Sequence, residues 1–192
     1  MIDFLKHIDK ETFLILNNFH SPVFDYIMYY INKGTTWLPI FILFAYFIVK
    51  QYNIKSIWII IFVGLLITST DQISVLLKET FMRLRPCHNP QLANLVHIVN
   101  GKCGGKFGFV SSHAANYFGL ITFLIIILNI KKFWIKILMI FWGIIICYSL
   151  IYLGVHYPAD VIIGALLGII LGFTWGKLNL LLLNRLYKKN SI

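Results

Sequence analysis

The fold is decided by residues 133–153, which read FWIKILMIFWGIIICYSLIYL. Lys136 is the one charged residue in this stretch, and it lies close to its start. A helix of about 20 apolar residues is long enough to cross the ~30 Å hydrocarbon core of a bilayer. The stretch therefore predicts a transmembrane helix.

Four other apolar stretches predict further spans, namely Trp37–Val49, Ile54–Leu77, Ala114–Ile130 and Val161–Trp175. Only 12% of the residues are charged and the mean hydropathy is +0.79, whereas a soluble domain has about 25% charged residues. We therefore expect an all-α integral membrane protein with a bundle of five to six transmembrane helices. Residues 1–192 should form a single membrane-embedded domain.

Residues 1–33 differ from these spans because polar side chains, such as Asn17 and Asp25, interrupt their apolar positions. Such groups are costly in hydrocarbon. We expect an amphipathic segment of one or two helices in the membrane interface, broken near Ser21 and Pro22. The alternative is a tilted sixth span.

The net charge of +10, from 17 Lys and Arg against 7 Asp and Glu, indicates the orientation. With five spans, the basic loops 50–55 and 131–136 and a basic tail at 184–192 lie on one side, which the positive-inside rule makes cytoplasmic. The connections 78–110 and 153–160 then face the periplasm or exterior. This arrangement predicts a multi-pass protein of the cytoplasmic (inner) membrane.

The connection 78–110 is also basic, which the positive-inside rule does not explain and a bound anion does. The sequence has no basic stripe interleaved with exposed aromatic residues, so it does not indicate a nucleic-acid partner. The expected partners are the bilayer and an anionic lipid substrate, and no obligate protein partner is evident.

The first candidate motif is residues 78–86, KETFMRLRP. Lys78 and Arg85 are seven residues apart, so a helix places them on one face. Pro86 should end that helix at Arg85. An ammonium and a planar guanidinium together suit a phosphate. The alternative is that both side chains only reach toward lipid head groups.

The second candidate motif precedes the third span, where Ser111 or Ser112 can cap the helix. Free backbone N–H groups and the positive end of the helix dipole form an anion site there. His113 lies beside this site, where an imidazole can hand a proton to a leaving group. A structural role for His113 is the alternative.

The third candidate motif runs from Ser149 to Asp160. His156 and Asp160 are four residues apart, so the carboxylate can accept a hydrogen bond from one imidazole nitrogen. The other nitrogen then keeps a free lone pair, which makes it a nucleophile for phosphorus. Pro158 suits the first turn of the last span.

Together these motifs make the chain resemble the type 2 phosphatidate phosphatase (PAP2) superfamily of membrane lipid phosphatases, in its small bacterial type. That family has the motifs K-x6-R-P, P-S-G-H and S-R-x5-H-x3-D. They match residues 78–86, 110–113 and 149–160 of this sequence. The resemblance implies a hydrolase that removes phosphate or pyrophosphate from lipids at the outer membrane face, with no metal and no organic cofactor.

The resemblance also implies residue roles. His156 would be the nucleophile that forms a phosphohistidine, His113 the general acid, and Asp160 the group that orients His156. The phosphate-binding residues would be Lys78, Arg85, Ser111, Ser112 and Ser149.

Two departures from the family pattern stand out. Val110 and Ser112 replace the Pro and Gly of the second motif, and Leu150 replaces the Arg of the third. Losing one group that stabilises transition-state charge costs on the order of 10²–10³ in rate. Arg83 or Lys106 could compensate, the enzyme could be slow, or the chain could be a catalytically impaired homologue that only binds lipid phosphate.

Cysteine placement leaves two possibilities in the outer connection. Cys87 and Cys103 could form a disulfide, worth about 3 kcal/mol by loop closure. With His88 and His97 they could instead form a Cys2His2 metal site, although the spacing fits no known zinc pattern. Cys147 should pack inside the fourth span.

The substrate is less constrained than the chemistry. Polyprenyl pyrophosphate, phosphatidylglycerophosphate, phosphatidate and lipid A phosphates all fit a site at the outer interface. A small bundle without a head-group domain favours a polyprenyl or other pyrophosphate. A transporter or channel is the rival class, but Asp71 is the only ionisable residue deep in a predicted span.

Overall fold

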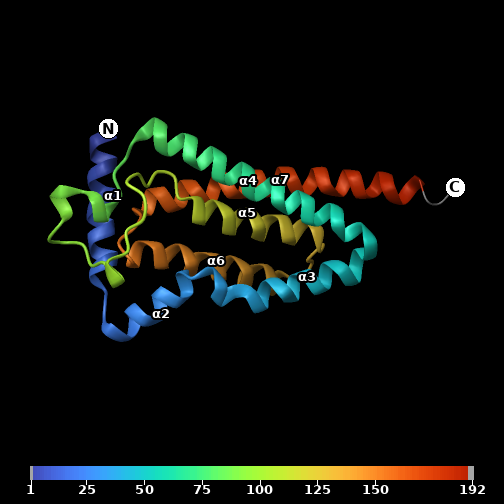
Figure 1. Ribbon diagram of the computed structural model, residues 1–192, viewed down its shortest axis with the longest axis horizontal. Coiled ribbons are helices and arrows are strands. Elements are labelled where there is room, and N and C mark those ends of the chain that lie inside the picture. Colours follow the sequence, from blue (N-terminus) through green and yellow to red (C-terminus); the bar gives the residue numbers. More distant parts are fainter. Residues whose placement is uncertain (1, 190–192) are drawn as a thin grey trace.

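The computed structural model describes the backbone of residues 2–189 and the side chains of residues 4–186. The described part of the chain is all-helical and contains seven α-helices, with short 3-10 turns in the connections between α2 and α5 (Figure 1). They are α1 (Ile2–Asn18), α2 (Pro22–Asn32), α3 (Leu38–Tyr52), α4 (Ser56–Phe81), α5 (Ser112–Ile127), α6 (Phe133–Tyr152) and α7 (Pro158–Lys189).

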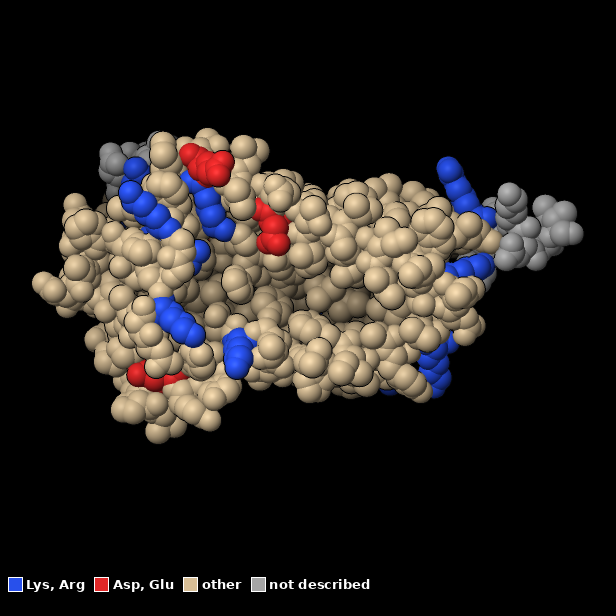
Figure 2. All heavy atoms as spheres, in the orientation of Figure 1, with Lys and Arg blue, Asp and Glu red and all other residues tan. Residues whose placement is uncertain are grey.

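Three stretches of the described chain are long and apolar enough to cross a membrane, namely Gly34–Phe81, Phe133–Tyr152 and Pro158–Leu186. The first of them contains α3 and α4, which run in opposite directions (Figure 1). Figure 2 shows Lys and Arg at both ends of the molecule and a broad band without charged side chains between them. The chain is therefore an integral membrane protein with multiple spans.

The helix bounds differ from the expected ones mainly at α7. The expected span ended at Trp175, but α7 continues to Lys189 because a leucine-rich segment with high helix propensity follows. Most of the basic tail expected at residues 184–192 therefore belongs to this helix, and residues 190–192 lie outside the described residues.

The N-terminal segment forms two helices with a break between them. Ser21 is extended, its side chain accepts a hydrogen bond from Phe24 N, and Pro22 begins α2. Helix α1 crosses the end of the bundle that carries the long connection (Figure 1). Its Asn17 is 1% exposed, and the amide donates to the carbonyls of Ile151 and Tyr152 at the end of α6.

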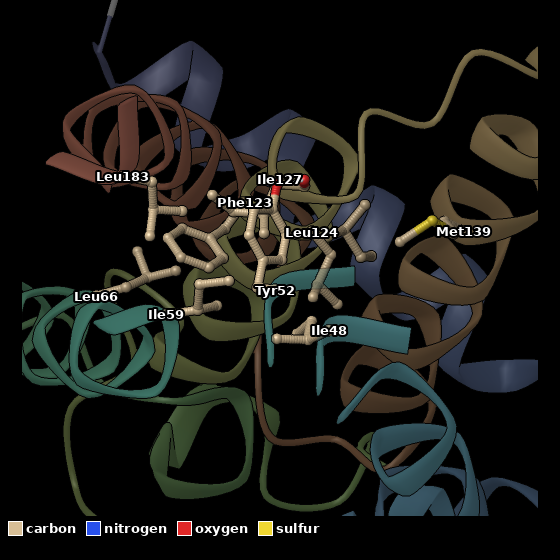
Figure 3. Close-up of a cluster of buried hydrophobic side chains, with 10 residues drawn as sticks. Ile48, Tyr52, Ile59, Leu66, Phe123, Leu124, Ile127, Met139 and Leu183 are labelled. Carbon is tan, nitrogen blue, oxygen red and sulfur yellow. Dashed lines mark hydrogen bonds between the residues drawn. The ribbon is translucent and has the colours of Figure 1, made fainter. Parts of the chain in front are cut away.

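The core is apolar and centres on α5. Figure 3 shows one cluster in which Tyr52, Phe123 and Ile127 come from α3 and α5, and the Tyr52 hydroxyl donates to Ile127 O at 2.5 Å. Helices α5 and α7 approach closely because glycines face each other, and a Cβ at Gly119 would lie 3.2 Å from Gly168 O. This contact places the N-termini of α5 and α7 side by side, where Ser111 N donates to Asp160 O at 3.0 Å.

Candidate active site

The first motif does not form one helical face, contrary to the sequence-based expectation. Helix α4 ends at Phe81, and Met82 adopts a left-handed conformation with its N–H on Lys78 O. The chain then pairs with residues 106–108, where Arg85 N donates to Lys106 O at 3.1 Å and Gly108 N donates to Arg83 O at 2.9 Å. This pairing satisfies the backbone after the helix and replaces the helical turn that the spacing predicted.

Arg85 is nevertheless held at the site. Its Nε donates to Phe107 O at 3.2 Å and its Nη1 to Cys103 O at 2.9 Å. Two carbonyls thus fix the guanidinium plane while leaving donors free for an anion.

The two cysteines of the connection are joined, because Cys87 and Cys103 form a disulfide with a Cα–Cα distance of 5.9 Å. His88 lies next to this bond and its Nε2 is 3.1 Å from Gly104 O. His97 pairs elsewhere, with its Nε2 2.8 Å from Asp25 Oδ1. The four side chains of the alternative Cys2His2 site therefore do not gather. Cys147 is buried in α6.

Both serines of the second motif are engaged at the start of α5. Ser111 is the N-cap residue, and its Oγ accepts from Ala114 N at 3.4 Å. The Ser112 hydroxyl accepts a hydrogen bond from Lys78 Nζ. The ammonium of Lys78 therefore lies at the N-terminus of α5, where its charge adds to the positive end of the helix dipole.

His113 and His156 line one cavity of about 340 Å³, together with Arg85 and Leu150. The His156 side chain is 2% exposed and Asp160 is fully buried. Burial, opposed in part by Asp160, lowers the pKa of His156 to about 4. The imidazole is therefore neutral at physiological pH and retains a lone pair.

The expected hydrogen bond between His156 and Asp160 is present only as a close approach. His156 Nδ1 lies 3.5 Å from Asp160 Oδ2 and has no other hydrogen-bond partner among the described residues. That oxygen accepts from Tyr157 N at 3.1 Å. Catalytic hydrogen bonds of this length in a free enzyme commonly tighten when substrate binds.

Of the third-motif residues on α6, Ser149 is placed differently from the expectation, whereas Leu150 lies at the cavity as expected. Ser149 is fully buried, donates to Ile146 O at 2.6 Å and accepts from Asn32 Nδ2 at 3.3 Å, and it is not a lining residue of the cavity. Leu150 does line the cavity, but it also packs in an apolar cluster with Phe13 and Leu92.

Neither cation expected to compensate for Leu150 lines the cavity. Arg83 instead binds Asp160, with its Nη1 2.8 Å from Oδ1, and Lys106 Nζ lies 5.7 Å from the Phe107 ring centroid. Two other cations, Lys33 and Lys102, line the cavity. Sequence reasoning missed them because they belong to no motif, although Lys102 lies in the basic connection.

An apolar helical bundle with imidazoles, a buried carboxylate and cations around one cavity defines an integral membrane protein built to act on an anion. The model of the PAP2 superfamily matches residues 56–181 of the chain. The crystal structure of Bacillus subtilis PAP2 type phosphatidylglycerolphosphate phosphatase has the same fold, with a TM-score of 0.66 at 22% identity over 90% of this chain and 84% of that one.

Three further proteins are similar at higher identity. A lipid A 4'-phosphatase of Bacteroides thetaiotaomicron is 40% identical over 172 residues, covering 88% of this chain and 75% of the relative. A lipid A 4'-phosphatase of Porphyromonas gingivalis is 33% identical over 175 residues, covering 89% and 72%. The crystal structure of Aquifex aeolicus LpxE has a TM-score of 0.64 at 27% identity, covering 87% and 93%.

The chain therefore belongs to the PAP2 superfamily. It is a membrane-embedded lipid phosphate phosphatase.

Proposed function

We propose that this phosphatase removes the 4'-phosphate of a lipid A-type glycolipid at the outer face of the cytoplasmic membrane. The similarity to two lipid A 4'-phosphatases, each over nearly nine-tenths of the chain, is the observation that carries this choice. The lipid A-type substrate replaces the pyrophosphate that the small size of the bundle favoured. The cavity beside His113 and His156 is where the phosphate would bind.

The proposed reaction has two steps. His156 Nε2 attacks phosphorus, the P–O bond to the sugar breaks, and His113 protonates the departing oxygen. Water then attacks the phosphohistidine, with His113 taking its proton, and inorganic phosphate leaves while His156 returns to the neutral form. Asp160 stabilises the positive charge that the phosphorylated imidazole carries.

The phosphate would be held by charges from separate elements. Lys78 and Arg85 supply two cations, and Ser111 and Ser112 place the N-terminus of α5 beside them. Fixed donors of this kind stabilise the oxygens of a transferring phosphoryl group. Ser149 supports the site through α6 and Asn32 rather than from the cavity wall.

The proposed topology uses the orientation that the basic loops indicate, with residues 78–110 on the outer side of the membrane. Helices α3 to α7 would be five spans of a single domain, with residues 1–33 in the interface and residues 78–110 forming the outer connection. A disulfide within that connection fits an oxidising compartment. The basic residues 184–192 would lie on the cytoplasmic side.

A second candidate function is binding of lipid phosphate without turnover, which the apolar Leu150 in the cavity wall favours. Purified protein incubated with bisphosphorylated lipid A, undecaprenyl pyrophosphate, phosphatidylglycerophosphate and phosphatidate separates these functions by the phosphate released. We expect release from lipid A, loss of release in His156→Ala, and activity that survives EDTA. Faster release from the pyrophosphate would overturn the substrate, and binding without release would support the second function.

A further inference from the structure

Arg83 lies between two carboxylates that come from opposite ends of the chain. Its Nη1 is 2.8 Å from Asp160 Oδ1, and its Nη2 is 2.5 Å from Asp9 Oδ2. The guanidinium carbon also lies 4.0 Å from the centroid of the Tyr157 ring. One guanidinium therefore joins α1 to the catalytic end of α7 in a planar, two-pronged contact.

The charged side chains of Asp9, Arg83 and Asp160 are largely removed from water. The Asp160 side chain is fully buried, that of Asp9 is 11% exposed and that of Arg83 is 24% exposed. Such partly buried pairs are screened less than surface pairs, so each charge affects its neighbour.

The two oxygens of Asp160 have separate partners. Oδ1 accepts from Arg83, while Oδ2 accepts from Tyr157 N and is the oxygen nearest His156 Nδ1, at 3.5 Å. Arg83 thereby fixes the rotation of the carboxylate that presents Oδ2 to the imidazole.

Asp9 likewise uses both of its oxygens. Oδ2 binds Arg83, and Oδ1 accepts from Ala159 N, in the first turn of α7, at 2.8 Å. The ring of Phe13, one turn further along α1, packs edge-on against Tyr157 with centroids 5.3 Å apart. Helix α1 is thus docked on the segment that contains His156 and Asp160.

We propose that Asp9 is a positioning residue for catalysis, acting through Arg83 on Asp160. The inference deepens the proposed function, since it rests on His156 as the nucleophile and Asp160 as its partner. Asp9 lies outside residues 56–181, the part of the chain that the family model matches. It therefore extends the active site to an element that precedes the matched domain.

The physical basis is charge sharing. With Asp9 present, Arg83 is balanced by two carboxylates, so the three groups together keep one negative charge beside His156. Without Asp9, Arg83 and Asp160 form a neutral pair, and the phosphorylated imidazole loses part of the field that stabilises its positive charge. The loss falls on the chemical step, so kcat should drop while KM stays nearly constant.

The test compares Asp9→Asn with Glu11→Gln. Both changes replace a carboxylate by an amide on α1, but Glu11 is exposed and two residues away from Asp9. With lipid A as substrate, we expect kcat of Asp9→Asn to fall by about tenfold, or about 1.4 kcal/mol of activation free energy, with KM within about twofold. Glu11→Gln should match the parent. Equal kcat for Asp9→Asn and the parent would overturn the proposal.

A double-mutant cycle with Arg83→Gln separates positioning from a structural role. If Asp9 acts through Arg83, Asp9→Asn should have little further effect on kcat in the Arg83→Gln background. The same tenfold loss in both backgrounds would show that Asp9 acts only on α7 through Ala159, which overturns the proposal. Melting temperatures of all variants, measured in one detergent, distinguish loss of folded protein from loss of turnover.

His156→Ala is measured beside these variants so that the two hypotheses are separable. Parental activity in His156→Ala would overturn the proposed function and, with it, the role of Asp9. Loss of activity in His156→Ala together with an unaffected Asp9→Asn would overturn the role of Asp9 alone.

Discussion

Gly108 lies directly against the Asp160 carboxylate, so that a Cβ at this position would be 2.9 Å from Asp160 Oδ2. The same atom would be 3.1 Å from Arg85 Cγ and 3.5 Å from His156 Nδ1. The backbone at Gly108 therefore packs on three proposed active-site residues, with no room for a side chain.

Gly108→Ala should reduce phosphate release by about 100-fold, because displacing catalytic groups by about 1 Å has an effect of that size. Gly105→Ala is the matched control, since a Cβ there meets nothing within 4 Å. Both variants are assayed on one lipid phosphate under identical conditions. Equal activity of the two variants would contradict the close packing of Gly108 on the site.

The pKa of His156, lowered by burial to about 4, predicts a pH dependence of stability. An unfolded histidine takes up its proton near pH 6.5, whereas the folded protein does so only near pH 4. Between these values the unfolded state binds more protons, so stability falls as the pH falls through that window and is fully present above it.

A comparison with His156→Gln isolates this contribution. From pH 6.5 down to pH 4, the melting temperature of the parent should fall by about 5 °C more than that of the variant. Parallel curves for the two proteins would mean that His156 has its ordinary pKa in the folded state.

Leu150→Arg should raise the rate of phosphate release by at least tenfold, or about 1.4 kcal/mol of activation free energy. Leu150 lines the cavity beside Arg85 and His156, so an Arg there would add a planar donor for the phosphoryl oxygens. Leu150→Met is the control for a change of shape without charge. An Arg variant that is as stable as the parent and no faster would show that Lys33 and Lys102 already supply the missing charge.

Reduction of the Cys87–Cys103 disulfide should lower both stability and activity. The bond closes a loop with a sequence separation of 16, worth about 3 kcal/mol of unfolding free energy. It also holds Cys103 O, which accepts from Arg85 Nη1 at 2.9 Å. The melting temperature and phosphate release are measured with and without dithiothreitol.

The double variant Cys87→Ser, Cys103→Ser is the control, because it should behave like the reduced parent and be insensitive to dithiothreitol. Activity that falls equally in this variant on adding reductant would place the sensitive group elsewhere.

Local sequence pattern predicted what depends on local structure. The helix expected at residues 133–153 is α6, and Asp160 lies in the first turn of α7 with His156 just before that helix. The pattern failed at Arg85 because the backbone after Phe81 pairs with a strand-like segment that is distant in sequence. Helical periodicity cannot indicate such a contact.

Contacts between residues far apart in the chain likewise could not be predicted from the sequence. Arg83 was considered as a substitute phosphate ligand, yet it binds Asp9 and Asp160, which are 74 and 77 residues away. Lys33 reaches the cavity from the end of α2. In each case the deciding factor is how the N-terminal helices dock on the bundle, and no motif encodes that docking.

The hydrogen bond from Ala159 N to Asp9 Oδ1 has a consequence for biosynthesis. Helix α1 leaves the ribosome before helices α3 to α6, whereas Ala159 belongs to α7. Asp9 on α1 therefore lacks its hydrogen-bond donor, Ala159 N, until α7 has been made. A nascent chain that stalls before α7 lacks Asp160 and the surface on which α1 docks, so α1 can join the active site only after α7 has been made.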